Sequence, residues 1–475
     1  MARNLTPDIC VIGAGSGGLT VAAAAASFGV DVVLVEKGLM GGDCLNYGCV
    51  PSKALIAAAE RAHAARMSAQ FGVHVDGLRV DFAQVHDHVH DVIAGIAPHD
   101  SVERFEGLGV TVIQAEGRFV DPSTVVAGDA TIKARRFVIA TGSRAAVPPI
   151  PGLDKAAYLT NETVFELTRL PDHLIIIGAG PIGLELAQAH RRLGAEVTVV
   201  EAEKALGRDD PELAAIVLDR VRAEGVEILE QAKVVRVEEG GAGPAVVVEA
   251  SGDERRIEGS HLLVATGRRP NVENLGLDAA GIAFDRRGIT VDKGLRTSNR
   301  KVYAIGDVAG GLQFTHVAGY HAGLVVRSIL FRLPVRDDRD MMPRVTFTSP
   351  EIGGVGLSEA QARSRFADRV RVVKAAYCGN DRARAERTTD GMVKLVIGPR
   401  GRLLGAEIVG SAAGEVVNLL SLALSRGVKV GQLAGFVSPY PTLSEVVKRA
   451  AISYYADAPK NLWVRRIVGF LSKFG

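Results

Sequence analysis

The chain has 475 residues, of which 47% are hydrophobic and 23% are charged, and this length predicts two to four domains of an ordinary globular protein. The 56 Lys and Arg residues nearly balance the 54 Asp and Glu residues, which gives no electrostatic argument for nucleic-acid binding. No apolar run is long enough to indicate a membrane span, and the N-terminus lacks a secretory hydrophobic region, so we expect a cytoplasmic protein.

An internal repeat organises the first half of the chain. The first copy reads D-I-C-V-I-G-A-G-S-G-G-L from Asp8, and the second reads H-L-I-I-I-G-A-G-P-I-G-L from His173. In each copy a short apolar strand leads through a glycine turn into a helical stretch, and a second apolar strand ends in an acidic residue, Glu36 or Glu201. The sequence therefore predicts two β-α-β units.

Both copies carry the G-x-G-x-x-G pattern that binds the pyrophosphate of a dinucleotide at a helix N-terminus. Glu36 and Glu201 are placed to accept hydrogen bonds from a ribose. A carboxylate at position 201 repels the extra phosphate of NADP(H), so we expect NAD(H) at the second site. The glycines of the two turns are Gly13, Gly15 and Gly18, and Gly178, Gly180 and Gly183.

Two later strands end in matching A-T-G turns, at Gly142 and Gly267, and a third, V-Y-A-I-G-D, ends at Asp307. This order predicts an α/β fold with two Rossmann-like dinucleotide-binding domains, one inserted in the other, followed by a C-terminal α+β domain. The expected boundaries are 1–153 with 272–341 for the first domain, 154–271 for the second, and 342–475 for the third.

Two cysteines, Cys44 and Cys49, lie in G-G-D-C-L-N-Y-G-C-V-P-S-K at residues 41–53. Their C-x4-C spacing differs from the C-x-x-C of zinc ribbons and thioredoxins. The surrounding glycines and proline are also unlike the setting of cysteines that only fill a core. We therefore interpret the pair as a redox centre with at least one lowered thiol pKa.

With the A-T-G turns, A-I-G-D, and T-S-P-E-I-G-G-V-G at 348–356, the chain resembles the class I pyridine nucleotide–disulfide oxidoreductases from residue 6 to about residue 456. The resemblance implies a homodimeric enzyme that uses FAD and NAD(P)H, with NAD(H) favoured, and that acts on a disulfide or dithiol partner. It also implies that residues 342–475 form the dimer interface.

The resemblance also implies roles for single residues. Cys44 would be the thiol that meets the substrate, and Cys49 the charge-transfer thiol beside the flavin. Lys53 would lie near flavin N5, paired with Glu185, and Asp307 would hold the ribityl and phosphate end. The full set of expected cofactor-binding residues is Gly13, Gly15, Gly18, Glu36, Lys37, Gly42, Thr141, Gly142, Asp307, Gly178, Gly180, Gly183, Glu201 and Gly267.

The chain departs from the family at residues 438–445. Disulfide-acting members carry H-x-H-P-T-x-S-E, whereas this chain reads S-P-Y-P-T-L-S-E, which keeps Glu445 but puts Tyr440 in place of the second histidine. A phenol accepts protons poorly at pH 7, so ordinary disulfide turnover should be slowed. Still, we expect both residues to complete the catalytic site.

Three readings of the substrate follow. A disulfide or dithiol partner is the first. Reduction of a soft metal ion, as in mercuric reductase, is the alternative, because that branch carries a tyrosine here, although its C-terminal cysteine pair has no counterpart. Soluble transhydrogenase shares the tyrosine but lacks the redox cysteines. A flavoprotein component of a larger assembly is the third reading.

Two weaker patterns remain. V-H-D-H-V-H-D at 85–91 puts His86 and His90 one helical turn apart, which we interpret as a solvated helix face, with no metal site expected. Residues 461–474 form an amphipathic pattern that favours docking onto the protein itself, with weak peripheral membrane contact as the alternative.

Overall fold

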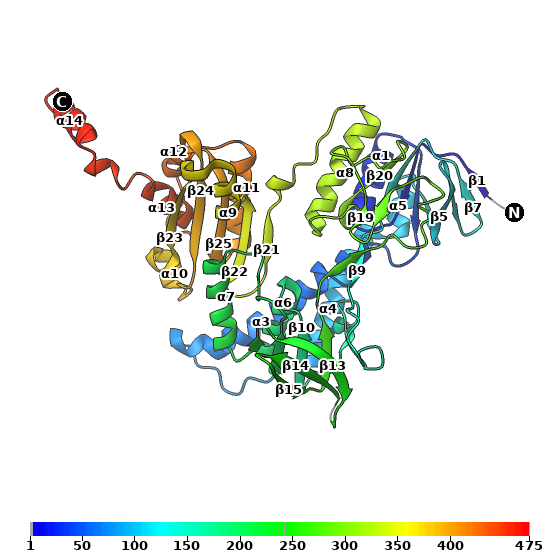
Figure 1. Cartoon of the computed structure of the whole chain (residues 1–475), viewed down its shortest axis with the longest axis horizontal. Helices are drawn as coiled ribbons and strands as arrows, with labels where there is room; N and C mark the ends of the chain where they lie inside the picture. Colours follow the sequence, from blue (N-terminus) through cyan, green and yellow to red (C-terminus); the bar gives the residue numbers. More distant parts are fainter. Residues whose placement is uncertain (1–2, 242, 475) are drawn as a thin grey trace. The chain divides into compact units, whose positions relative to one another are not determined.

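The computed structural model describes residues 3–241 and 243–474 (Figure 1). The chain divides into two compact units, Met1–Ala202 with Glu227–Asp337, and Glu203–Val226 with Asp338–Gly475. The three domain boundaries expected from the sequence stay a prediction. Each unit is described by itself.

The first β-α-β repeat forms the central part of a parallel five-stranded sheet in the first unit, with strand order β20-β8-β2-β3-β4. Its strands are short and mostly apolar because helices and loops cover both faces, and the charged and amide side chains lie at strand ends. Helix α1 packs against α8 on this sheet. The elements are β2 (Ile9–Ile12), α1 (Ser16–Ser27), β3 (Val32–Glu36), β4 (Thr111–Gln114), β8 (Arg136–Ile139), β20 (Val302–Ala304) and α8 (Thr315–Leu330).

The second repeat builds a parallel sheet of order β12-β11-β10-β16 in the same unit, next in sequence to an antiparallel meander of three strands. The two repeats confirm the prediction of a mixed α/β fold with two dinucleotide-type units. The elements are β10 (His173–Ile177), α6 (Pro181–Leu193), β11 (Glu196–Val200), β12 (Glu227–Leu229), β13 (Lys233–Glu239), β14 (Pro244–Ala250), β15 (Asp253–Glu258) and β16 (His261–Val264).

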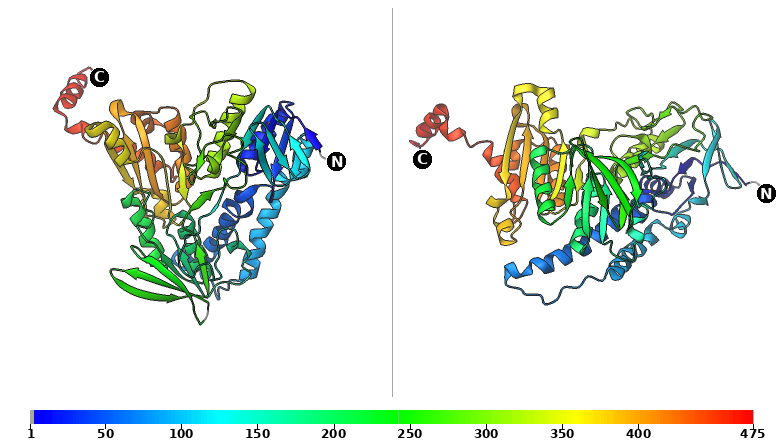
Figure 2. Two further views of the ribbon diagram at one scale, coloured as in Figure 1. Left: turned by 45° about the vertical axis from the view of Figure 1, so that its right-hand side comes forward. Right: turned by 60° about the horizontal axis from the view of Figure 1, so that its bottom comes forward.

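The cysteine motif folds into two consecutive helices that follow β3. Helix α3 is long and packs against both α6 and α4, so it joins the cysteine motif to the helix of the second repeat (Figure 2). A two-stranded antiparallel ladder, β9 with β17, connects the segments where the chain passes between the two parallel sheets. The elements are α2 (Gly42–Asn46), α3 (Cys49–Met67), α4 (Phe82–Ile96), β9 (Ser143–Ala145) and β17 (Arg268–Pro270).

The second unit is an antiparallel five-stranded sheet of order β21-β22-β25-β24-β23 with helices packed on it. Val393 and Leu395 belong to the core that α11 and α13 complete. Between them Lys394 points to the opposite face and binds Asp210, the N-cap of α7, at 2.5 Å. The elements are α7 (Pro211–Ala223), β21 (Arg344–Thr346), β22 (Glu351–Gly356), β23 (Arg371–Ala376), β24 (Met392–Ile397), β25 (Leu403–Gly410), α11 (Ala413–Ser425), α12 (Val430–Gly435) and α13 (Glu445–Ser453).

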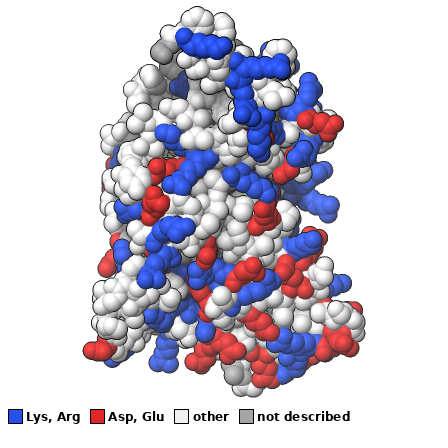
Figure 3. Space-filling model, turned by 90° about the vertical axis from the view of Figure 1, so that its left-hand side faces the viewer, with Lys and Arg blue, Asp and Glu red and all other residues white. Residues whose placement is uncertain are grey.

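The chain ends in helix α14 (Leu462–Leu471), drawn in red in Figure 1, and every residue from 461 to 474 is exposed. Figure 3 faces this end of the chain, where Lys and Arg side chains lie beside uncharged surface. Among residues 3–241 and 243–474, no helix combines the length and the apolar character needed to span a membrane.

Candidate functional site

The two glycine turns have the same geometry. Gly13 has φ +106° and Gly178 has φ +108°, both in the left-handed region that favours glycine. A Cβ atom would lie 2.4 Å from the carbonyl oxygen of Ala140 at the first position and 2.5 Å from that of Ala265 at the second. Only glycine therefore lets each turn pass so close to the neighbouring strand.

Behind each turn the packing is tight, and in front of it there is open space. A Cβ atom on Gly18 or Gly183 would collide with the carbonyl oxygen of the first glycine of its own turn, at 1.8 and 2.0 Å. By contrast, nothing lies within 4 Å of a Cβ built on Gly15 or Gly180, the N-caps of α1 and α6. Neither helix has a side-chain cap, so its first N–H groups are available to a pyrophosphate.

An acidic side chain closes each cradle. Oε2 of Glu36 accepts a hydrogen bond from Ala14 N at 2.5 Å, and its Oε1 accepts one from Gly38 N at 2.7 Å. Oε2 of Glu201 accepts a hydrogen bond from Ala179 N at 2.8 Å. Both carboxylates thus lie beside their glycine turn, where the ribose of a dinucleotide is held in folds of this kind. The residues of both sites fit a dinucleotide.

The cysteine motif lies against the first of these turns. Gly41 pairs with Gly15 in an isolated β-bridge, and a Cβ on Gly42 (φ +58°) would lie 2.7 Å from Cα of Gly15. Lys37, by contrast, is exposed and pairs with Glu116 at 3.8 Å. The structure therefore brings Gly42 to the first cradle and leaves the Lys37 side chain at the surface.

Asp307 is the second residue of a short turn, Gly306–Ala309, and is held by residues from two other segments. Its Oδ2 accepts a hydrogen bond from Ser143 Oγ at 2.6 Å and lies 3.8 Å from Nε of Arg268. Arg268 also pairs with Asp43 at 3.0 Å. Burial raises the pKa of Asp307. Ser143, Arg268 and Asp43 were not predicted, although each adjoins a predicted motif.

The two A-T-G turns connect the segments that cross between the parallel sheets. Thr141 Oγ1 donates to the carbonyl of Asn271 at 2.8 Å, and Asn271 Nδ2 donates back to Thr141 O at 2.9 Å. The carbonyl of Gly142 accepts from Asn271 N, and that of Gly267 accepts from Ala146 N. Thr141, Gly142 and Gly267 thus fix the path of the backbone in this region.

Cys44 lies in α2 and Cys49 is the first residue of the 19-residue helix α3. All four cysteines of the chain are free thiols, and among them Cys44 is half-buried and Cys49 is exposed. The Cys49 sulfur lies 3.4 Å from Oγ1 of Thr315, on helix α8. The cysteine pair therefore lies at the N-terminus of α3, beside a threonine that the sequence reasoning missed.

The two thiols differ in acidity. The hydrogen bond with Cys44 lowers the pKa of Cys49 to about 6, and Thr315 and the nearby Lys53 ammonium act in the same direction. The same hydrogen bond and burial raise the pKa of Cys44. A position at a helix N-terminus is one that favours a thiolate. In the reduced pair, therefore, the thiolate is favoured on Cys49 over Cys44.

Lys53 and Glu185 meet although they lie on different helices, α3 and α6. Lys53 Nζ donates to Oε2 of Glu185 at 2.7 Å and to Ser52 Oγ at 3.3 Å. The Glu185 side chain is only 7% exposed, whereas that of Lys53 is 35% exposed. The carboxylate is thus fixed by its surroundings and in turn holds the lysine ammonium.

Tyr440 and Glu445 belong to the second unit. The Tyr440 hydroxyl donates to Oδ2 of Asp381 at 3.2 Å, and its side chain is exposed. Asp381 raises the pKa of Tyr440 above its ordinary value of 10.0. Glu445 begins α13, and its carboxylate accepts from Thr442 N at 3.4 Å. The tyrosine is therefore held as a hydrogen-bond donor by an acid that the sequence reasoning did not identify.

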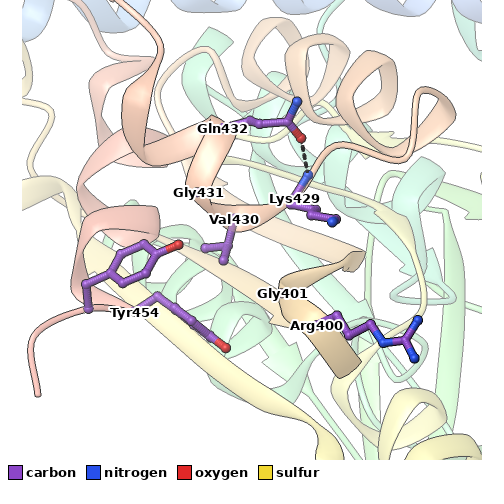
Figure 4. A pocket seen from close by; sticks show the side chains of 8 residues that line it. Arg400, Gly401, Lys429, Val430, Gly431, Gln432 and Tyr454 are labelled. Atoms are coloured by element: carbon purple, nitrogen blue, oxygen red, sulfur yellow. Dashed lines mark hydrogen bonds between the residues drawn. The ribbon is translucent and has the colours of Figure 1, made fainter. Parts of the chain in front are cut away.

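A separate cavity of about 560 Å³ lies in the second unit (Figure 4). Arg400 and Lys429 line it together with the rings of Tyr454 and Tyr455, and Gln432 accepts a hydrogen bond from Lys429 N at 2.9 Å. None of these residues belongs to the predicted catalytic or cofactor-binding set.

Comparison with known proteins agrees with this geometry. Residues 7–322 match the family model described as pyridine nucleotide-disulphide oxidoreductase, and residues 342–451 match the dimerisation domain of the same family. A mercuric reductase from Streptomyces lividans is 36% identical over 95% of this chain and 97% of that protein. A dihydrolipoyl dehydrogenase from Geobacillus stearothermophilus is 37% identical over 94% of this chain and 95% of that protein.

Solved structures give the same result. The HOCl-induced flavoprotein disulfide reductase RclA from Escherichia coli, solved as a Cu(II) complex, covers 94% of this chain and 99% of its own with a TM-score of 0.84 at 28% identity. LpdA from Mycobacterium tuberculosis covers 95% of this chain and 99% of its own with a TM-score of 0.86 at 27% identity. The chain belongs to the pyridine nucleotide–disulphide oxidoreductases, enzymes that depend on FAD and NAD(P).

Proposed function

We propose that this enzyme is an NADH-dependent reductase whose Cys44/Cys49 dithiol delivers electrons to a soft metal ion. FAD, bound at the first glycine turn, supplies the two-electron transfer between the nicotinamide and the cysteine pair. The observation that carries the dithiol relay is the asymmetric thiol pair, in which the pKa of Cys49 is lowered to about 6 and Thr315 lies 3.4 Å from its sulfur.

Each residue of the pair has a separate task. Cys49, the thiolate, faces Thr315 and the Lys53 cation, and Cys44 remains the thiol that meets the substrate. Lys53 holds a positive charge beside the pair, and Glu185 fixes its position. Asp307, held by Ser143, supports the ribityl end of the cofactor.

The substrate is inferred from the hydrogen bond between Tyr440 and Asp381. Cleavage of a disulfide leaves a thiolate that must be protonated, and an imidazole normally serves that step. The Tyr440 hydroxyl donates a hydrogen bond to Asp381, and this raises the pKa of the tyrosine, which makes the phenol a weaker acid and a poorer proton shuttle near pH 7. A soft metal ion held by two thiolates needs no such shuttle.

Relatives support both substrate classes. Four relatives at 34–37% identity are named mercuric reductase, and RclA was solved as a Cu(II) complex. Relatives at 36–37% identity are named dihydrolipoyl dehydrogenase. These relatives make a disulfide or dithiol partner the second candidate substrate.

The proposal specifies NADH over NADPH. Glu201 lies at the second turn, where its carboxylate would repel a 2′-phosphate. Comparison of kcat/KM for NADH and NADPH tests this preference, and Glu201→Gln should bring the two kcat/KM values closer together. Equal kcat/KM values in the parent enzyme would contradict the assignment.

We also propose that the enzyme works as a cytoplasmic homodimer that makes weak contact with membrane surfaces through residues 461–474. On α14, Trp463, Ile467 and Phe470 lie on one face and are all exposed, Arg465 lies on the other face, and the Arg466 guanidinium lies over the Trp463 ring at 5.6 Å. Co-sedimentation with anionic liposomes should be lost when residues 459–475 are deleted. Unchanged sedimentation would refute this contact.

The substrate assignment is tested by steady-state NADH oxidation with Hg(II), Cu(II), lipoamide and glutathione disulfide. The parent should reduce a metal ion and turn over the disulfides slowly, whereas Tyr440→His should gain disulfide activity by at least about tenfold. Rapid lipoamide turnover by the parent would overturn the metal proposal and favour the second candidate.

A further inference from the structure

A cluster of metal-ligating side chains lies outside the redox site, on helix α4 and the short turn η3 (Val164–Glu166). His86 and His90 stand one turn apart on α4, with ring centroids 4.2 Å from each other. Glu166 reaches the pair from η3, and its Oε1 lies 3.8 Å from Nε2 of His90. One ligand atom from each of the three lies within 4.8 Å of the others.

The backbone beneath the cluster is firmly packed. Val89 anchors α4, and Val164 and Phe165 anchor η3, all three being buried. His90 Nε2 also lies 3.4 Å from the carbonyl oxygen of Phe165, which links the two elements. Because a carbonyl oxygen only accepts, this hydrogen bond puts the proton of His90 on Nε2 and leaves its lone pair on Nδ1. The backbone positions of the three candidate ligands are therefore fixed, and only their side chains are free to adjust.

The hydrogen bonding of His86 prepares it for coordination. Its Nδ1 lies 3.2 Å from Oδ1 of Asp87, and because a carboxylate only accepts, Nδ1 is the atom that carries the proton. The lone pair is then left on Nε2. A carboxylate behind the imidazole is the usual arrangement for histidines that bind a metal, since it orients the ring and makes it more basic.

We propose that His86, His90 and Glu166 bind a divalent transition-metal ion, with Zn²⁺ as the first candidate and water completing the shell. Two imidazoles and one carboxylate are a donor set that Zn²⁺ accepts. Bonds of about 2.0–2.1 Å at tetrahedral angles separate ligand atoms by about 3.3 Å. The spacing here needs a small closing movement, which half-exposed side chains can make.

The ion would link two segments that are distant in the sequence. Helix α4 follows the cysteine motif, and η3 precedes the first strand of the second repeat. Binding to the folded state alone stabilises that state by mass action. The site is therefore structural, separate from the thiolates that take the substrate.

The test uses the full-length, tag-free protein with Cys44, Cys49 and Cys378 replaced by serine, so that thiolates cannot compete for the ion. Isothermal titration with Zn²⁺ should show one equivalent bound. His86→Ala, His90→Ala and Glu166→Gln should each weaken binding by at least about tenfold. Saturating Zn²⁺ should raise the melting temperature of the parent but not that of His90→Ala.

Matched controls are available on the same elements. His88 is an exposed histidine of α4, and Glu162 is an exposed acid just before η3. His88→Ala and Glu162→Gln should keep the affinity within about twofold. Melting curves in EDTA show whether each variant folds without metal. Absence of binding by the parent below about 100 µM Zn²⁺, or unchanged affinity in His90→Ala, overturns the proposal.

Discussion

The Nζ atom of Lys53 lies 2.7 Å from Oε2 of Glu185, although the two residues are 132 positions apart in the sequence. Lys53 follows the cysteine pair on α3, and Glu185 lies on the helix of the second glycine turn. One ion pair thus joins the cysteine motif to the second dinucleotide unit. A change at either residue therefore affects both the cysteine motif and the second dinucleotide unit.

Lys53→Met is expected to destabilise the protein by about 2 kcal/mol, because it leaves the buried Glu185 carboxylate without this donor. The shift of the urea unfolding midpoint measures the effect. Lys460→Met is the control, since Lys460 pairs with Asp457 on the exposed surface and should change the free energy of unfolding by less than about 0.5 kcal/mol. Equal effects of both changes would show that the Lys53–Glu185 pair adds nothing.

The thiolate of Cys49 should be visible in the pH dependence of alkylation. The pKa is lowered to about 6, so the reactive thiolate of the reduced enzyme is present above pH 6 and is lost as the pH falls through that value. Iodoacetamide should therefore react with a half-maximal rate near pH 6, and Cys49→Ser should remove this phase. A single midpoint above pH 8 in the parent would contradict the assignment.

Much of this architecture could be predicted from the sequence, because the steric requirements that define it act within short segments of the chain. The steric need at Gly13 and at Gly178 arises within one strand-turn-helix segment, so the pattern of glycines was sufficient to predict both turns. The meeting of Lys53 and Glu185 followed from the resemblance.

What the sequence could not supply are contacts between distant segments. Ser143 on β9 and Arg268 on β17 reach Asp307, and Asp43 on α2 pairs with Arg268, only because these separate segments meet there. The partner of Tyr440, Asp381, lies 59 positions away with no motif to mark it. The spacing of the two histidines on α4 was visible in the sequence, whereas the approach of Glu166 from η3 was not.

The glycine turns allow a contrast between two neighbouring positions. Gly18→Ala should destabilise the protein by about 3 kcal/mol or more, because the new methyl group would lie 1.8 Å from a backbone oxygen. Gly15→Ala should leave the fold within about 1 kcal/mol, since Gly15 has an ordinary extended backbone and open space beside it. Its methyl group would instead enter the pyrophosphate cradle, so the protein should be isolated with less FAD. Thermal melting and FAD content measured together distinguish the two, and a normal FAD content in a folded Gly15→Ala protein would argue against this cradle.

The hydrogen bond from Tyr440 to Asp381 makes a final prediction about proton chemistry. Because a neighbouring carboxylate disfavours the phenolate, the pKa of Tyr440 is raised, and the phenol keeps its proton to a higher pH than a free tyrosine would. Asp381→Asn removes the negative charge and should lower this pKa toward its ordinary value. Ultraviolet difference titration follows the phenolate, with Tyr440→Phe subtracted to isolate the one tyrosine. Arg382→Gln, a change of charge at the next position, is the control and should not lower the pKa. If Asp381→Asn leaves the titration of Tyr440 unchanged, the acid does not hold the phenol, and the argument against a disulfide substrate loses its structural basis.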